Sequence, residues 1–234
     1  MSEPLTAEGF AAALPDLMEN VSRETLQSLQ AYADILIAWQ ARMNLVGPST
    51  LPDLWRRHFL DSAQLYMLLP DNDRHSERKL KIFDLGSGAG FPGLVLAILA
   101  RHDMRYPGGR KLRVNLIESD RKKAAFLAEA ARAVGFTADD TSNTAIRIRA
   151  QRAEVIEPQI ADVITARALA PLDKLLPWMA RFADDKTILL IPKGEQAEAE
   201  LQSAAKDWKM KIDRLQSRSD ARGTILVLTQ LAKK

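Results

Sequence analysis

Short apolar runs alternate with longer amphipathic stretches through most of the chain. Five stretches have the length of strands: residues 81–85, 112–117, 144–149, 161–166 and 187–192. Residues 144–149 alternate apolar with basic side chains, which predicts a strand with one wetter face, as at a sheet edge, and the other four are mainly apolar. Helical patterns follow four of them, at residues 93–100, 121–134, 172–183 and 195–208. Strands that alternate with helices predict an α/β fold with a doubly wound, mostly parallel sheet, because each helix carries the chain back across one face.

The rhythm changes near the end of the chain. Residues 210–215 and 224–231 have strand patterns and no helix between them. A connection this short predicts an antiparallel pair. The result is a Rossmann-like sheet of seven strands closed by an antiparallel hairpin. This ending is typical of class I S-adenosylmethionine-dependent methyltransferases and unusual for NAD-binding sheets.

The first third of the chain has helical patterns only. Residues 22–39 repeat apolar side chains at three- and four-residue steps, which is typical of an amphipathic helix. We expect Trp39 and Trp55 to pack this part onto the rest of the protein rather than to stack on bases. A polar segment ends it, so we divide the chain into an N-terminal helical cap, residues 1–79, and a methyltransferase domain, residues 80–234.

A glycine loop joins the first strand to its helix. Residues 84–93 read Asp-Leu-Gly-Ser-Gly-Ala-Gly-Phe-Pro-Gly. Glycines let the backbone turn sharply and approach a ligand, and the helix start offers free N–H groups. Gly88, Gly90 and Gly93 also fit a dinucleotide loop, so spacing alone leaves NAD open. Asp84 favours S-adenosylmethionine, whose amino group is a cation. An ordinary strand-to-helix turn is the alternative without a ligand.

Acidic residues follow the next two strands. Glu118 stands where a carboxylate can accept hydrogen bonds from both ribose hydroxyls of either cofactor. Asp120 suits the N-terminus of the helix after it, where a negative charge is stabilised by the helix dipole. Glu154 follows the third strand, where an adenine amino group needs an acceptor. Its position is the only reason to prefer that role over a place on the surface.

Composition narrows the chemistry. The 234 residues include no cysteine, which excludes disulfides, thiolate metal sites and a cysteine nucleophile. Three scattered histidines argue against zinc, so we expect no metal. Without a recognisable leader or a long apolar run, we expect a cytoplasmic protein with no membrane partner. The methyltransferase domain carries 26 basic and 19 acidic residues of the chain's 33 and 30, which favours a polyanionic partner.

Motifs spread over most of the chain resemble one family. The specific ones are Arg57-His58-x-x-Asp61-Ser62 and the Gly90-x-Pro92-Gly93 end of the glycine loop; Arg152-Ala153-Glu154, Arg167-Ala168 and Lys193-Gly194 accompany them. The family is RsmG, also called glucose-inhibited division protein B, which methylates guanine N7 in 16S ribosomal RNA. The sequence departs from it at Val46, often threonine in the family, and in a longer loop at residues 101–111; both could alter RNA contacts.

The resemblance implies cofactor contacts at Gly86, Phe91, Ala153, Glu154 and Arg167. It also implies that S-adenosyl-L-methionine donates its methyl group to N7 of one guanine in the decoding-region loop, on 16S ribosomal RNA or the small ribosomal subunit. With the residues argued above, the predicted cofactor-binding set is Asp84, Gly86, Gly88, Phe91, Glu118, Ala153, Glu154 and Arg167. The predicted RNA-binding set is Arg56, Arg57, His58, Lys122, Lys123, Arg147, Arg149 and Lys193.

Guanine N7 has a lone pair and no proton, so the reaction needs no general base. We assign Arg167 to positioning, through the cofactor carboxylate, a phosphate or guanine O6 alone, because a bidentate contact would occupy N7. Its alternative role is to pair with Asp84 or Glu118. Two other functions stay open: a small-molecule methyltransferase, and a non-catalytic nucleotide-binding module on the ribosome. A monomer is the expected state.

Overall fold

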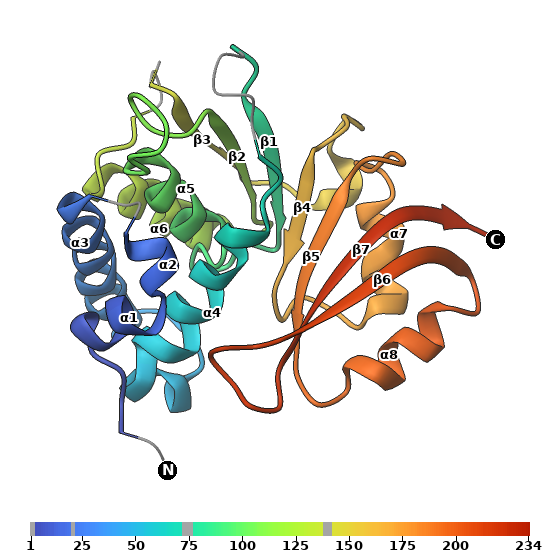
Figure 1. Ribbon diagram of the computed structural model, residues 1–234, viewed down its shortest axis with the longest axis horizontal. Coiled ribbons are helices and arrows are strands. Elements are labelled where there is room, and N and C mark those ends of the chain that lie inside the picture. Colours follow the sequence, from blue (N-terminus) through green and yellow to red (C-terminus); the bar gives the residue numbers. More distant parts are fainter. Residues whose placement is uncertain (1–2, 20–21, 72–76, 138–141) are drawn as a thin grey trace.

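A seven-stranded sheet forms the centre of the protein (Figure 1). The computed structural model describes residues 3–19, 22–71, 77–137 and 142–234. The strand order is β3-β2-β1-β4-β5-β7-β6. The strands are β1 (Leu80–Leu85), β2 (Leu112–Ile117), β3 (Thr144–Arg149), β4 (Val163–Ala166), β5 (Ile188–Lys193), β6 (Trp208–Gln216) and β7 (Thr224–Lys233). The first five are parallel, and β7 pairs antiparallel with β5 and β6, which confirms the predicted fold.

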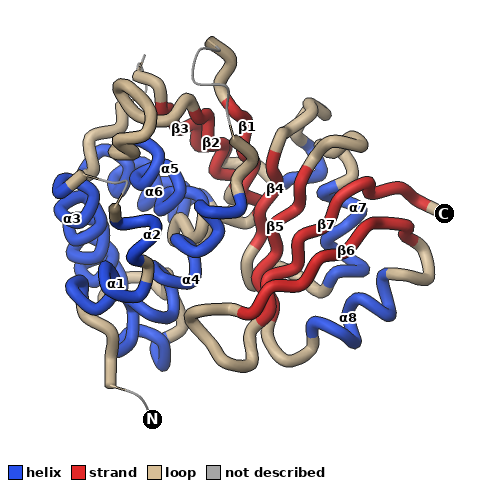
Figure 2. Tube along the Cα trace, viewed as in Figure 1, coloured by secondary structure: helices blue, strands red, loops and turns tan. Residues whose placement is uncertain are grey.

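Helices cover both faces of this sheet (Figure 2). They are α5 (Gly93–Arg101) and α6 (Arg121–Ala133) on the face that also carries the N-terminal cap, and α7 (Leu172–Met179) and α8 (Ala197–Ala204) on the other. A short turn, η4 (Ala153–Val155), follows β3. Two predicted helices were too long. α7 ends at Met179, and Trp208 begins β6 with its ring buried in the core under α7 and α8.

The first part of the chain is helical, as predicted. Its elements are α1 (Ala7–Ala13), α2 (Pro15–Met18), α3 (Arg23–Gln40), η1 (Pro48–Asp53), η2 (Trp55–Leu60), α4 (Asp61–Ala63) and η3 (Gln64–Leu68). Trp39 meets Phe126 of α6 edge-on at 5.7 Å, and Trp55 stacks on Phe59 at 4.6 Å. Trp39 therefore packs the cap onto the main domain, as expected, whereas the ring partners of Trp55 lie within the cap. The cap shares one apolar core with β1, β2 and α5, so it is built into the main sheet domain.

The basic loop at residues 101–111 is tied to the protein. Arg110 is buried, donates to the carbonyl oxygen of Pro70 and lies 5.3 Å from the ring centres of both Tyr66 and Tyr106. Arg105 forms an ion pair with Asp103 at 2.7 Å. Arg110 thus fastens the loop to the end of the cap, whereas Arg105 is paired inside the loop. The effect of this longer loop on RNA contacts stays a prediction. The predicted polar connection at residues 71–79 lies partly outside the described residues.

Candidate functional site

β1 delivers the glycine loop to the edge of the sheet where the parallel strands end. Gly86, Gly88 and Gly90 have φ values of +67°, +56° and +97°, a region that favours glycine. Gly93 has a different role. A Cβ atom there would lie 2.4 Å from Leu116 Cδ2, so this glycine lets α5 pack closely against the sheet. The loop thus combines a left-handed backbone that favours glycine with a tight helix start.

Asp84 lies beneath the loop with no exposed surface. Its carboxylate accepts hydrogen bonds from Thr165 Oγ1 at 3.0 Å and from the backbone N–H of Gly93 at 3.1 Å. Burial raises the pKa of Asp84 from 3.8 to about 6. The carboxylate therefore ties β4 to the start of α5 beneath the loop, and its contact with the cofactor stays a prediction.

Glu118 connects the glycine loop to the end of β2. Its carboxylate oxygens accept from the backbone N–H groups of Gly88 at 2.8 Å and Asp120 at 2.7 Å. Asp120 in turn accepts from Lys122 N at 2.7 Å and Lys123 N at 3.2 Å, which confirms its predicted place at the start of α6. Glu118 is thus held at the loop, in the position predicted for a ribose contact.

The third predicted cofactor contact is at η4. Ala153 is buried, and Glu154 pairs with Arg152 at 3.2 Å. Backbone hydrogen bonding lowers the pKa of Glu154, so its carboxylate is ionised and able to accept. Leu169 closes the other side of the loop, because a Cβ atom on Gly86 would lie 2.5 Å from Leu169 Cδ1. The segment after β4 therefore touches the glycine loop directly.

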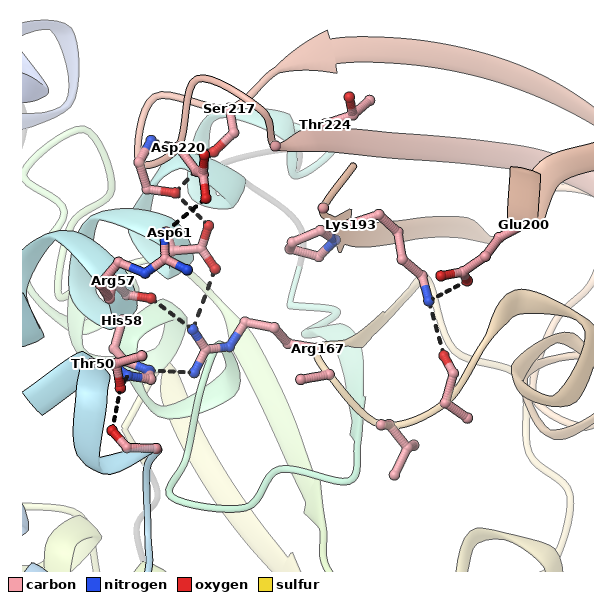
Figure 3. Close-up of a pocket in the computed structure, with 18 of the residues that line it drawn as sticks. Thr50, Arg57, His58, Asp61, Arg167, Lys193, Glu200, Ser217, Asp220 and Thr224 are labelled. Carbon is pink, nitrogen blue, oxygen red and sulfur yellow. Dashed lines mark hydrogen bonds and ion pairs between the residues drawn. The ribbon is translucent and has the colours of Figure 1, made fainter. Parts of the chain in front are cut away.

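A cavity of about 700 Å³ adjoins this segment (Figure 3). Four regions line it: the cap, the β4–α7 loop, the start of the β5–α8 connection and the β6–β7 loop. Its polar lining consists of Thr50, Arg57, His58, Asp61, Arg167, Lys193, Glu200, Ser217, Ser219, Asp220 and Thr224. A volume of this size matches the pockets that hold small organic groups.

Arg167 stands where the cavity meets the glycine loop. Its Nη1 donates to the carbonyl oxygen of Arg57 at 3.0 Å and to Asp61 Oδ2 at 3.3 Å, and its Nη2 donates to His58 Nδ1 at 2.6 Å. Its guanidinium carbon lies 5.1 Å from the centre of the Phe91 ring. The alternative role, pairing with a nearby carboxylate, is observed, but the partner is Asp61 of the cap and not Asp84 or Glu118. Within the described residues, three of the five N–H donors are engaged.

His58 is a neutral, buried side chain rather than a phosphate-binding cation. It is 7% exposed and packs against Phe91 at 5.1 Å. Burial, together with the charges of Arg167 and Arg57, lowers its pKa to about 3. His58 is therefore not a cationic contact for phosphate, and a contact with RNA from the cavity lining stays a prediction. A residue type that often carries charge is here a packed acceptor for Arg167.

The remaining basic residues fall into two groups. Arg57 and Lys193 line the cavity, paired with Asp220 at 2.8 Å and with Glu200 at 2.7 Å. The other basic residues lie outside the lining. Arg56 pairs with Asp53. Lys122 and Lys123 are at the start of α6, and Arg147 and Arg149 are on the edge strand β3. Their contact with RNA stays a prediction.

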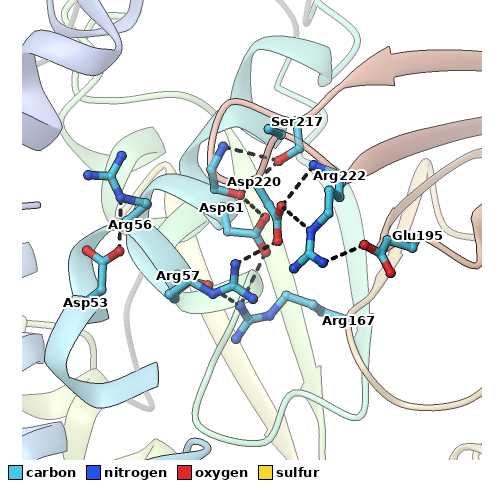
Figure 4. A network of polar contacts seen from close by, with 12 residues as sticks. Asp53, Arg56, Arg57, Asp61, Arg167, Glu195, Ser217, Asp220 and Arg222 are labelled. Atoms are coloured by element: carbon cyan, nitrogen blue, oxygen red, sulfur yellow. Dashed lines mark hydrogen bonds and ion pairs between the residues drawn. The ribbon is translucent and has the colours of Figure 1, made fainter. Parts of the chain in front are cut away.

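Sequence reasoning missed the acidic side of the cavity. Asp61 belongs to the motif that begins at Arg57, but nothing in the pattern placed it against Arg167. Asp220 lies in the β6–β7 loop, and Figure 4 shows it between Arg57 and Arg222. Glu200 is on α8 and also accepts from the backbone N–H of Leu172 at 2.9 Å. Only folding brings these carboxylates to one place.

Comparison with known proteins gives consistent results. One family model matches residues 25–223: GidB, described as rRNA small subunit methyltransferase G. Proteins named ribosomal RNA small subunit methyltransferase G are similar over nearly the whole chain. The one from Paramagnetospirillum magneticum is 45% identical over 91% of this chain and 92% of its own. The one from Rhodospirillum centenum is 46% identical over 98% and 95%.

A solved structure supports the fold. The crystal structure of MtNAS in complex with MTA and tNA superimposes with a TM-score of 0.51 at 14% sequence identity, covering 87% of this chain and 69% of that one. At this identity the likeness concerns the fold alone. No helix in the described ranges is long and apolar enough to cross a membrane, and those ranges hold no group of three or more acidic or histidine side chains arranged for a metal ion.

Proposed function

The chain belongs to the GidB family, the rRNA small subunit methyltransferases G, and from this premise we propose the substrate and the roles of the site residues. Membership makes the protein a ribosomal RNA methyltransferase that uses S-adenosyl-L-methionine. The proposed acceptor is N7 of a guanine in the decoding-region loop of 16S ribosomal RNA. The proposed partner is that RNA, free or in the small subunit, with the protein acting as a cytoplasmic monomer.

The reaction asks little acid–base chemistry of the protein. The N7 lone pair forms a bond to the methyl carbon, the carbon–sulfur bond breaks, and its electron pair stays on sulfur as S-adenosylhomocysteine. No proton moves, and the positive charge passes from sulfur to the guanine ring. The protein therefore has to align two groups and tolerate a cation. The carboxylates of Asp61, Glu200 and Asp220 offset the positive charges of the cations with which they pair in the cavity lining.

The position of Arg167 carries the proposal. It lies over Phe91 of the glycine loop and also lines the cavity, so one guanidinium faces both the proposed cofactor site and the proposed base site. Two of its N–H donors are unused by described residues, which leaves them for the cofactor carboxylate, a phosphate or guanine O6. Glu118 and Glu154 would accept from ribose hydroxyls and the adenine amino group, and Asp84 would attract the cofactor amino group from below.

The basic residues outside the cavity are the proposed RNA footprint. Lys122 and Lys123 at the start of α6 and Arg147 and Arg149 on β3 carry positive charge outside the cavity lining. Cations that contact phosphates release bound counterions, so RNA affinity should fall as salt rises. Arg57 and Lys193 in the lining, and Arg56 outside it, would join them if their carboxylate partners yield to phosphate.

Two measurements test the proposed function. Calorimetry should show S-adenosyl-L-methionine binding to the wild-type protein, and NAD should not bind. Small subunits from cells that lack the gene should gain one N7-methylguanine in 16S ribosomal RNA when incubated with the protein and cofactor. RNA binding without methyl transfer would support the non-catalytic module. Cofactor binding with no product on any form of the RNA would support a small-molecule methyltransferase.

A further inference from the structure

Arg167 is held by a chain of polar side chains that ends on the backbone of the cap. We infer that His58 and Thr50 are positioning residues, which fix the orientation of the Arg167 guanidinium for methyl transfer. Neither is expected to touch substrate through this role. The inference rests on the proposed function, because it concerns the use of Arg167 in that reaction.

The chemistry of the partners determines the direction of every hydrogen bond in the chain. A guanidinium can only donate, so His58 Nδ1, at 2.6 Å from Arg167 Nη2, must be an acceptor without a proton. A neutral imidazole then carries its proton on Nε2, which donates to Thr50 Oγ1 at 2.7 Å. The Thr50 hydroxyl donates in turn to the carbonyl oxygen of Gly47 at 2.7 Å. Each group has one role, and none can be reversed.

Packing fixes the same groups from the side. His58 lies against the Phe91 ring at 5.1 Å, and the Arg167 guanidinium lies over that ring at 5.1 Å. Phe91 belongs to the glycine loop, so the chain of hydrogen bonds connects the cap to the proposed cofactor site. The planar guanidinium has donors in fixed directions. Fixing the Nη2 donor through His58 and the Nη1 donors through Asp61 and the Arg57 carbonyl thereby sets where the two unused donors point.

Two substitutions at His58 distinguish the role of Nδ1 as a hydrogen-bond acceptor from the packing of the imidazole ring. In His58→Asn the amide oxygen can stand near the former Nδ1 position and still accept from Arg167. In His58→Gln the amide reaches toward Thr50, and Arg167 loses its acceptor. We expect kcat to fall about tenfold or more in His58→Gln and clearly less in His58→Asn, since an unpaired charged donor is costly. Equal losses in the two variants would contradict an acceptor role.

A double-mutant cycle distinguishes positioning from general stability. Arg167→Lys removes the planar fork, and if His58 acts only through it, then the double variant His58→Gln/Arg167→Lys has the same kcat as Arg167→Lys alone. A double variant whose fold-loss in kcat is the product of the two single losses would overturn the inference. Cofactor Kd and kcat are measured for every variant. The cycle is evaluated for whichever of the two parameters Arg167→Lys changes. Methyl transfer to small subunits from cells lacking the gene is the assay.

Thr50 gives a second, milder test at the far end of the chain. Thr50→Val removes the acceptor that holds the Nε2–H form of His58, while Thr50→Ser keeps it. We expect Thr50→Val to lower kcat and Thr50→Ser to restore most of it, with unchanged thermal unfolding in both. Equal activity in the two variants would overturn the role of Thr50 in the chain.

A matched control lies elsewhere in the fold. His102 is also partly buried and bonded to a hydroxyl, with its Nε2 3.3 Å from Ser28 Oγ, but it does not line the cavity. His102→Gln should leave kcat unchanged. A wild-type protein that binds no cofactor would instead refute the proposed function, and this inference with it. An active wild type with an active His58→Gln variant would refute the inference alone.

Discussion

Replacing Asp84 by asparagine should stabilise the protein at neutral pH while weakening cofactor binding. The two oxygens of Asp84 accept from Thr165 and from the N–H of Gly93. An asparagine can keep the contact with Gly93, because its oxygen can accept from that N–H, and its NH₂ can donate to the Thr165 hydroxyl oxygen. The Thr165 hydroxyl then changes from donor to acceptor, so the substitution removes a buried charge at the cost of the acceptor for one hydroxyl proton.

The magnitude follows from the pKa of Asp84, which burial raises from 3.8 to about 6. At about 1.36 kcal/mol per pKa unit, this rise amounts to about 3 kcal/mol. The folded protein holds the proton more tightly than the unfolded chain. The stabilisation of the folded protein by this proton is complete below the pKa of Asp84 in the unfolded chain and is lost as the pH rises through its pKa in the folded protein. At neutral pH the ionised carboxylate therefore bears the full cost of burial.

Urea unfolding of wild type and Asp84→Asn at two pH values tests this reasoning. The difference in free energy of unfolding between variant and wild type should increase by about 1.4 kcal/mol between about pH 5 and pH 7.5. At pH 5 about half of the destabilisation caused by ionised Asp84 is already present in the wild type, and at pH 7.5 nearly all of it is. Calorimetry at neutral pH should show weaker binding of S-adenosyl-L-methionine. A stability difference that does not change with pH would refute the buried-charge argument. Unchanged affinity would remove Asp84 from the proposed cofactor site.

Three further outcomes are expected. Gly93→Ala should lower stability by roughly 1–3 kcal/mol, because its Cβ would overlap Leu116; equal melting temperatures would contradict the tight packing of α5. Arg110→Met should destabilise by roughly 2–4 kcal/mol in urea, since it leaves buried carbonyl groups unpaired, but should not change the salt dependence of RNA binding. Lys122→Gln/Lys123→Gln should reduce the slope of log affinity against log salt by about 1 to 2, with cofactor affinity unchanged; an unaltered slope would exclude them from the footprint.

Local patterns accounted for most of the fold. Most strands were predictable because they are short runs that are apolar or alternate apolar with polar residues, and the antiparallel ending followed from the length of one connection. The end of α8 was not predictable. Ala205 and Lys206 favour continuing the helix, but burying the Trp208 ring in the core under α7 and α8 outweighs that local preference.

The candidate site was also predictable only where its residues are close in the sequence. The glycine loop is contiguous, so its turn and the acids after the next strands could be placed from order alone. The cavity wall could not, because Asp61 and Asp220 are brought together only by tertiary packing. His58 was misassigned for a related reason: residue type suggests a charge, whereas the Phe91 ring and the Arg167 guanidinium around it enforce a neutral side chain.

The contact between the cap and the β6–β7 loop has a consequence for biosynthesis. Ser219 donates to Asp61 Oδ1 at 2.6 Å, and Arg57 pairs with Asp220, so the cavity wall closes across about two thirds of the chain. The glycine loop precedes Ser219 and Asp220 in the chain, so a ribosome synthesising this protein releases the loop before it releases these partners. The cavity wall can therefore close only after Ser219 and Asp220 have been synthesised.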